Sequence, residues 1–216
     1  MKKQHPDYIV VEGPIGVGKT TLAKRLAESF NTELMLELAV DNPFLSRFYA
    51  DPKTVALPTQ LFFLFQRAKQ IESLRQRDMF RPVQVSDFLI EKDKLFASIT
   101  LDSDELMLYQ QVYEKLTIDV QSPDLVIYLQ APIETLMKRI EKRGYDYEKA
   151  INHDYLKKIS DAYIDFFYGY TVAPLLIVNT DDFDLSIDEK NYNLLLEHIS
   201  RLPSGRHYFN PIAVKL

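Results

Sequence analysis

The chain has 216 residues and a net charge of −5, and 46% hydrophobic against 26% charged residues is ordinary for a soluble globular protein. This length suffices for a full hydrophobic core, so we expect a single domain over residues 1–216. The acidic balance argues against a nucleic-acid polymer as partner, because such ligands usually need a basic face. No cysteine occurs, which excludes disulfides, thiol catalysis and zinc sites built from cysteine.

The sequence also lacks membrane and export signals. No apolar run reaches the length that spans a bilayer, and residues 1–7 contain no apolar signal region. We therefore expect a cytoplasmic protein with no membrane partner.

The first predicted element is a short buried strand over residues 8–12, followed directly by a phosphate-binding loop. A helix comes next, because apolar residues recur at helical spacing after Thr21. The loop fits the pattern G-x-x-x-x-G-K-[ST]. Its residues are Gly13, Pro14, Ile15, Gly16, Val17, Gly18, Lys19 and Thr20.

This loop predicts that the chain binds a nucleoside triphosphate, with Thr21 at the start of the helix included in the site. The glycines allow backbone N–H groups to converge on phosphate oxygens, and the helix adds its positive amino-terminal end. We expect Lys19 to bind the β- and γ-phosphates and the Thr20 hydroxyl to bind Mg²⁺. Incidental glycines between a strand and a helix are the alternative, which the matching order of strand, loop and helix disfavours.

Two more short strands are predicted in the first half of the chain, and each ends in a carboxylate. The first covers residues 34–37 and ends at Glu37, and the second covers residues 82–87 and ends at Asp87. Between them, Pro58 opens a long helix through about residue 78, whose apolar face is broadened by phenylalanines.

The second half of the chain continues the alternation of helices and strands. Residues 125–129 and 175–179 are continuous apolar runs, typical of strands buried on both faces of a parallel sheet. Asp102 and Glu105 are predicted to cap the start of the helix over residues 102–120. Helices are predicted over residues 92–100, 102–120, 133–143, 151–170 and 188–200. This alternation predicts an α/β fold with a five-stranded parallel sheet flanked by helices.

Ligands of such sheets bind at the carboxyl ends of the strands, where the loop, Glu37 and Asp87 are expected to meet. A carboxylate beside a triphosphate can hold Mg²⁺ or accept the proton of an attacking hydroxyl. Together these groups predict transfer of the γ-phosphoryl group to an acceptor hydroxyl. We expect Asp87 to hold Mg²⁺ with Thr20, which leaves Glu37 as the general base.

From about Tyr8 to Phe183 the sequence resembles the deoxynucleoside kinase family, and the spacings between the matching pieces follow the family pattern. Besides the loop, these pieces are Glu37, residues 42–49, Gln60, Arg67, residues 86–87, Asp93, residues 95–97, residues 139–144, Glu148 and residues 178–179. The resemblance implies a three-layer nucleoside-kinase fold with a helical lid at about residues 139–149. It also implies ATP with Mg²⁺, a homodimer, and phosphorylation of the 5′-hydroxyl of a deoxynucleoside.

The resemblance further implies roles for individual residues in the deoxynucleoside site. Glu37 would activate the 5′-hydroxyl, and Asp87 would lie beside it in the same substrate pocket. Gln60 and Asp93 would read the base, and Arg67 would orient Asp93.

Other residues are implied at the sugar and the phosphates. Tyr49 and Glu148 would hold the 3′-hydroxyl of the sugar. Arg139 and Arg143 on the lid helix would contact the transferring phosphoryl group, and Phe183 would pack against the adenine of ATP.

Side-chain chemistry supports part of this set. Gln60 and Arg67 are seven residues apart and share a helix face, although a solvated polar stripe is the alternative. Arg139 and Arg143 are i,i+4 neighbours, although a solvated basic face would look the same. An ionised Asp93 only accepts hydrogen bonds, so it favours a base with an amino group over thymine. The choice of a purine rests on the resemblance.

Two positions depart from the family pattern. Phe88 stands where the family usually has an arginine after the strand-end carboxylate, and Tyr145 replaces the second arginine of the lid. Lys92 or Lys94 would replace the first arginine only in part, because a lysine lacks the guanidinium fork.

Two other functions remain open at this point. A thymidylate-type nucleoside monophosphate kinase shares the loop and the lid, but its acceptor phosphate needs further fixed cations. A nucleotide-binding relative without activity would account for Phe88 and Tyr145, but not for the retained loop lysine and carboxylates. The tail from residue 201 to 216 has no assigned structure.

Overall fold

The computed structural model describes residues 6–75, 84–116 and 120–211, and in these residues it has one sheet of six parallel strands. The strands follow the order β2-β3-β1-β4-β5-β6 across the sheet. They are β1 (Tyr8–Glu12), β2 (Glu33–Met35), β3 (Gln84–Ser86), β4 (Leu125–Gln130), β5 (Leu175–Asn179) and β6 (Arg206–Phe209). The predicted α/β class and parallel sheet are confirmed, with six strands in place of five.

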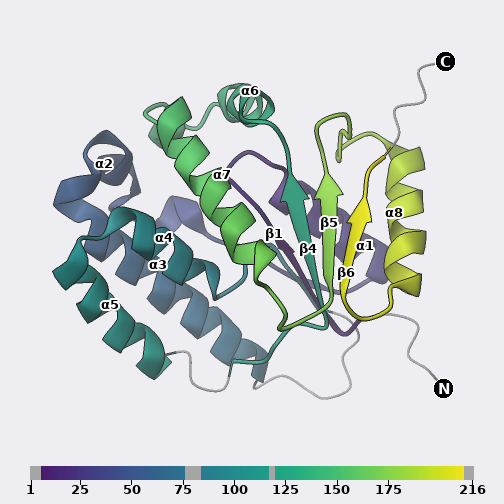
Figure 1. Cartoon of the computed structure of the whole chain (residues 1–216), viewed down its shortest axis with the longest axis horizontal. Helices are drawn as coiled ribbons and strands as arrows, with labels where there is room; N and C mark the ends of the chain where they lie inside the picture. Colours follow the sequence, from purple (N-terminus) through teal and green to yellow (C-terminus); the bar gives the residue numbers. More distant parts are fainter. Residues whose placement is uncertain (1–5, 76–83, 117–119, 212–216) are drawn as a thin grey trace.

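Helices connect the strands, as the alternating pattern predicts (Figure 1). The α-helices are α1 (Lys19–Phe30), α2 (Leu45–Ala50), α3 (Pro52–Arg75), α4 (Lys92–Thr100), α5 (Ser103–Leu116), α6 (Ile133–Arg143), α7 (His153–Tyr168) and α8 (Glu189–Arg201). Two short 3₁₀ helices are η1 (Ala39–Asp41) and η2 (Asp146–Glu148).

The sheet divides the core into two layers of contacts. On one face, Ile9 and Val11 of β1 pack with α1 and α8, and on the other face Val10 packs with α4 and α7. Because side chains alternate along a strand, one apolar strand serves both layers. Figure 1 shows α7 crossing one face of the sheet, with α1 behind the strands. This is the expected three-layer arrangement.

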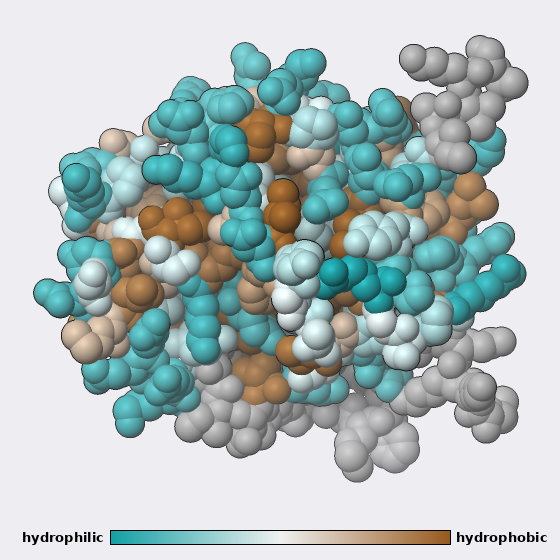
Figure 2. All heavy atoms as spheres, in the orientation of Figure 1, coloured by the Kyte–Doolittle hydropathy of each residue, from teal (hydrophilic) through white to brown (hydrophobic). Residues whose placement is uncertain are grey.

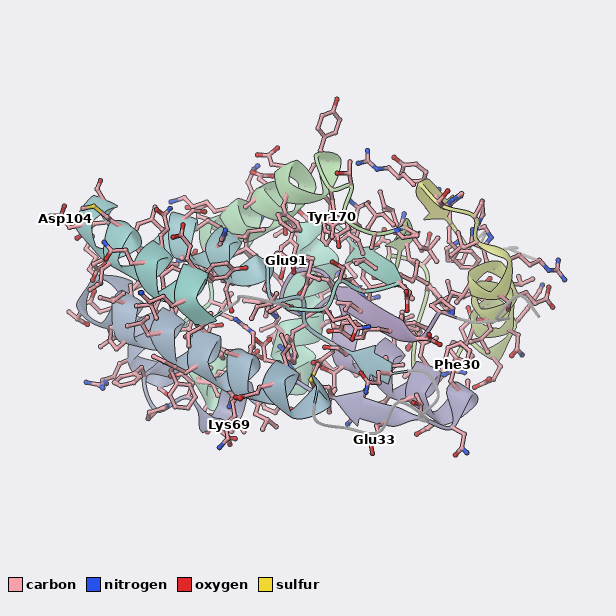
Figure 3. The ribbon with its side chains drawn as sticks, turned by 90° about the horizontal axis from the view of Figure 1, so that it is seen from below. Phe30, Glu33, Lys69, Glu91, Asp104 and Tyr170 are labelled. Carbon is pink, nitrogen blue, oxygen red and sulfur yellow. The ribbon has the colours of Figure 1, made fainter. Side chains whose placement is uncertain are left out.

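Helices α3, α4 and α5 form a further unit beside the sheet. Buried residues of all three helices, among them Leu64, Ala97 and Tyr109, make a separate apolar cluster. In Figure 3, α3 and α5 lie to one side of the strands, with Lys69 and Asp104 pointing outward. This unit therefore forms a wall at the side of the sheet where β3 and β2 lie.

Strand β6 lies in the tail for which the sequence predicted no structure. It pairs in parallel with β5, at the edge of the sheet. Arg206 donates hydrogen bonds to the carbonyls of Phe167 (2.9 Å) and Tyr168 (2.7 Å) at the end of α7. The side chains of β6 are alternately exposed and half-buried, so no continuous apolar run in the sequence indicated this strand.

Several boundaries differ from the prediction. Strand β2 ends at Met35, two residues before Glu37, and α3 begins at Pro52 instead of Pro58. The helix is interrupted at Val55, which has φ −140° and ψ 17°. A proline ring inside a helix clashes with the preceding turn and lacks an N–H, which explains a break just before Pro58. The predicted elements at residues 76–78, 82–83 and 117–119 lie outside the described residues.

The predicted cap of α5 is confirmed. The Asp102 carboxylate accepts hydrogen bonds from the N–H groups of Asp104 (3.0 Å) and Glu105 (2.9 Å). In return, the Glu105 carboxylate accepts from the N–H of Asp102 at 3.3 Å. This reciprocal pair is a capping box, and it fixes the start of the helix.

The outer surface is mixed in character. Figure 2 shows apolar residues on one face in small groups among hydrophilic ones. Exposed large apolar side chains, such as Val40, Tyr168 and Ile187, come from different parts of the chain. Among the described residues, no helix combines the length and the apolar character needed to cross a bilayer.

Candidate active site

The phosphate-binding loop connects β1 to α1, as predicted. Gly13, Gly16 and Gly18 all have positive φ angles, which residues with a Cβ atom rarely adopt. At Gly16 a Cβ would also lie 2.9 Å from the carbonyl oxygen of Leu136 in α6. The loop is therefore shaped by its glycines and closed on one side by the predicted lid helix.

Lys19 lies inside the loop. Its ammonium donates hydrogen bonds to the carbonyls of Gly13 (2.8 Å) and Pro14 (3.2 Å). Burial lowers the pKa of Lys19 to about 8, and the nearby ammonium of Lys92 acts in the same direction. An anion in the loop would favour the charged form of Lys19, as the predicted contact with the β- and γ-phosphates requires.

Thr20 and Asp87 meet as the prediction of a metal site requires. The Thr20 hydroxyl donates to the Asp87 carboxylate at 2.6 Å, and the backbone N–H of Glu37 donates to its other oxygen at 2.7 Å. Burial raises the pKa of Asp87. In the part of the chain that the structure describes, no group of three or more His, Cys, Asp or Glu residues could hold a metal. A hydroxyl and one carboxylate fit Mg²⁺ that takes its remaining ligands from phosphates and water.

Glu37 lies between two buried cations. Its carboxylate forms an ion pair with Arg67 and a second one with Lys92, at 2.9 Å from the Lys92 ammonium. Arg67 pairs with Asp93 as well, which confirms the expected contact between these two residues. Burial lowers the pKa of Arg67 to about 10, a value at which the guanidinium stays charged at neutral pH. Glu37 is therefore surrounded by charges that favour its ionised form.

A single pocket of about 610 Å³ connects the loop with this ion-pair network. It brings together most of the predicted site, because the loop, α3 and the lid face one space. From the loop and α1 the pocket takes Ile15, Gly16, Lys19, Thr20 and Thr21. From the predicted acceptor site it takes Glu37, Tyr49, Gln60, Arg67, Asp87, Arg143 and Glu148. Aromatic walls that the sequence did not predict are Phe63, Phe96, Tyr147, Tyr155 and Tyr163.

The lid contributes an ion pair to this pocket. The Arg143 guanidinium donates to the Glu148 carboxylate at 3.0 Å and lies 5.1 Å from the ring centre of Tyr145. Burial, then the neighbouring Tyr155 and Glu148, raise the pKa of the Tyr49 hydroxyl well above its ordinary value. Tyr49 thus stays a hydrogen-bond donor beside the Glu148 carboxylate.

Outside the phosphate-binding loop, three predicted site residues do not line the pocket. Arg139 donates to the carbonyl of Thr180 at 2.5 Å, and so fastens α6 to the end of β5. Asp93 is fully buried and paired with Arg67, so Arg67 faces the pocket in its place. Phe183 is also fully buried, with its ring centre 6.3 Å from that of Phe209. A core position does not present Phe183 to an adenine ring.

The sequence suggested Lys92 or Lys94 as a partial replacement for the arginine that is missing at Phe88. Lys92 lines the pocket, whereas Lys94 lies over the ring of Tyr113, 4.4 Å from its centre. Phe88 is fully buried in the cluster beside α3 and α5.

Glu12 is fully buried next to the loop, and the sequence analysis did not include it in the site. Its only signal in the sequence was a charged residue at the end of an otherwise apolar strand.

Comparisons with known proteins agree with this geometry. The sequence model of the deoxynucleoside kinase family matches residues 9–203. Deoxyguanosine kinase of Bacillus subtilis (strain 168) is 35% identical over 201 residues, which cover 90% of this chain and 97% of that protein. The deoxyadenosine/deoxycytidine kinase of the same strain is 29% identical and covers 93% of this chain and 96% of its own length.

A solved structure shares the fold. Deoxyadenosine kinase from M. mycoides, determined with products bound, superposes with a TM-score of 0.77 at 23% identity. The match covers 90% of this chain and 100% of that chain. The family match over most of the chain, the similarity to curated kinases and the shared fold lead to one conclusion. This chain belongs to the deoxynucleoside kinase family and is a phosphotransferase.

Proposed function

We propose that this protein transfers the γ-phosphoryl group of ATP to the 5′-hydroxyl of a purine deoxynucleoside, as a step of nucleotide salvage. The observation that carries the proposal is the single pocket in which Lys19 and Thr20 of the loop face Glu37 and Gln60. One space therefore holds groups suited to a triphosphate and groups suited to an uncharged nucleoside. Family membership supports the same reaction.

Each group has a defined task in this mechanism. Lys19 and the loop N–H groups bind the β- and γ-phosphates, and Glu37 accepts the proton of the 5′-hydroxyl as the oxygen attacks phosphorus. Tyr49 and Glu148 hold the 3′-hydroxyl, and Arg143 on the lid balances charge on the transferring group. Mg²⁺, held by Thr20 and Asp87, would neutralise charge that develops on the phosphates.

The lid and the adenine site need a finer assignment. Arg139 is tied to Thr180 and the loop carbonyl of Val17, so we assign it to holding α6 against the loop. Arg143 is then the lid cation that reaches the phosphoryl group. The fully buried position of Phe183 supports a role in the core for this residue.

Purine selectivity has support from the relatives and from the pocket. Relatives of this chain include a deoxyguanosine kinase and a deoxyadenosine/deoxycytidine kinase. Arg67 lines the pocket and offers only N–H donors, which match the O6 and N7 acceptors of guanine. Gln60 both donates and accepts, so it can read a second base edge. We therefore propose deoxyguanosine as the preferred substrate. This choice depends on Arg67 and Gln60, because the buried Asp93 does not line the pocket.

The alternative functions fit the pocket less well. A monophosphate acceptor would need additional positive charge near the acceptor site, but the charges of Arg67 and Lys92 are balanced there by the Glu37 carboxylate. The Glu37 carboxylate would also repel a second phosphate. A relative without activity has no physical need for a complete loop together with a base and a metal-binding carboxylate.

Steady-state turnover with ATP·Mg²⁺ across four deoxynucleosides and their monophosphates tests the proposal. We expect deoxyguanosine or deoxyadenosine to give the highest kcat/KM. Turnover of monophosphates alone would support the monophosphate kinase, and no turnover with intact ATP binding would support the inactive relative. On family membership alone, we also propose that the protein is cytoplasmic and forms a homodimer. Cell fractionation tests the location, and sedimentation equilibrium tests the oligomeric state.

A further inference from the structure

Lys92 is the first residue of α4, and its ammonium lies in the centre of the site. The side chain is 3% exposed, and the ammonium lies 2.9 Å from a Glu37 oxygen and 3.7 Å from a Glu12 oxygen. It therefore connects the proposed base to a carboxylate that lies under the phosphate-binding loop. No role in the mechanism above uses either of these contacts.

Glu12 is a fixed anchor. One of its oxygens accepts hydrogen bonds from the Gly13 N–H and the Tyr163 hydroxyl, both at 2.9 Å. The other oxygen accepts from the Leu89 N–H at 2.8 Å and faces Lys92. These bonds come from the loop, from α7 and from the segment before α4. Three donors from three parts of the fold therefore fix the orientation of this fully buried carboxylate.

The neighbours of Lys92 in the sequence face other regions. Glu91 lies close to Tyr170 in Figure 3. Burial raises the pKa of Tyr170, and the Glu91 carboxylate raises it further. Lys94 is exposed and lies over the ring of Tyr113. Of these three charged residues at the start of α4, Lys92 is the one that lines the pocket. Its placement therefore follows from the helix start and from Glu12, and not from a general basic face.

We propose that Lys92, held by the buried Glu12 carboxylate, is a positioning residue that orients Glu37 for proton transfer. The inference rests on the proposed function, in which Glu37 is the general base. Arg67 cannot do this alone, because it is shared with Asp93. Glu12 in turn makes the buried ammonium tolerable, because an unpaired charge at this depth would favour its neutral form.

Charged groups from several elements surround Lys92. Burial lowers the pKa of Lys92 to about 8, so its ammonium is charged at neutral pH and can hold the Glu37 carboxylate. The other charged or titratable groups that face Lys92 or its anchor are Glu12 on β1, Lys19 on α1, Arg67 on α3, Asp87 after β3 and Tyr163 on α7.

The experiment compares kcat and the KM for deoxyguanosine in wild type, Lys92→Met and Lys92→Arg at neutral pH and saturating ATP·Mg²⁺. In Lys92→Met we expect kcat to fall by ~10- to 100-fold from the loss of orientation, with the KM for deoxyguanosine unchanged. Lys92→Arg keeps a charged donor for Glu37 and should restore most of the lost kcat. Lys94→Met is the control on the same helix and should match wild type.

The outcomes separate this inference from the proposed function. Equal losses of kcat in Lys92→Met and Lys92→Arg, or a rise in the KM for deoxyguanosine with kcat unchanged, would overturn the inference. If Lys92→Met does not fold, Lys92→Gln also lacks the ammonium and carries the same expectation. If wild type phosphorylates no deoxynucleoside, or Glu37→Gln keeps full turnover, the proposed function itself has failed.

Discussion

Replacing Glu37 by glutamine is the most direct test of the proposed mechanism. The backbone N–H of residue 37, which binds Asp87 at 2.7 Å, is unaffected by the change. The side chain keeps its shape but loses its charge between Arg67 and Lys92. Each of these cations keeps a second carboxylate, Asp93 for Arg67 and Glu12 for Lys92. We therefore expect a folded variant whose free energy of unfolding falls by only about 1–3 kcal/mol.

The effect on turnover should be larger than the effect on folding. A positioned general base contributes ~10²–10⁴ in rate. At about 1.36 kcal/mol for each factor of ten, this range is a rise of about 2.7–5.4 kcal/mol in the activation barrier. Glutamine cannot accept the proton of the 5′-hydroxyl, so the whole loss should appear in kcat. The affinity for ATP·Mg²⁺ should not change, because Asp87 keeps both of its donors.

Three measurements decide the matter. These are kcat at saturating ATP and deoxyguanosine, ATP affinity by titration calorimetry with and without Mg²⁺, and the melting temperature. The matched control is Asp87→Asn, which should weaken the Mg²⁺-dependent part of ATP binding. A fall in kcat of less than tenfold in Glu37→Gln would refute its role as the base. Collapse of ATP·Mg²⁺ binding in this variant would instead show that Glu37 and Asp87 have exchanged roles.

Three further predictions follow from the site. Lys19→Ala should abolish phosphoryl transfer, because the β- and γ-phosphates lose their main protein counter-ion; full steady-state activity of the purified variant would contradict this. Phe183→Ala should lower the free energy of unfolding by about 3–5 kcal/mol, because the side chain is fully buried. Denaturant unfolding measures that loss, and a changed preference between ATP and GTP would instead favour the adenine contact. In a four-substrate competition thymidine should rank below both purine deoxynucleosides, and its ranking first would reject the purine assignment.

The sequence predicted the fold well where a pattern was both local and regular. The apolar runs at residues 125–129 and 175–179 became β4 and β5 with almost the same bounds. The loop pattern was correct because glycine conformations and a following helix are local properties. Strand β6 was not predicted, because its half-buried edge position gives no apolar run.

The sequence carried less information about contacts in the site than about which residues gather there. Seven-residue spacing predicted that Gln60 and Arg67 share a helix face, and both residues line the pocket. Sequence could not show that Arg67 covers Asp93, because that depends on the packing of α3 against α4. Glu12 and Lys92 are 80 residues apart, and only the parallel sheet brings them to the same place.

The ion pairs beneath the pocket limit how this protein can be made more heat-resistant. Glu12, Arg67, Lys92 and Asp93 are each at most 4% exposed. Exchanging buried ion pairs for apolar residues of similar volume is often neutral or stabilising by ~1–4 kcal/mol. A laboratory selection that rewards thermal survival alone would therefore tolerate or favour the loss of these charges. Selection for thermostable variants has to score turnover in the same screen, or it will enrich inactive proteins with an intact fold.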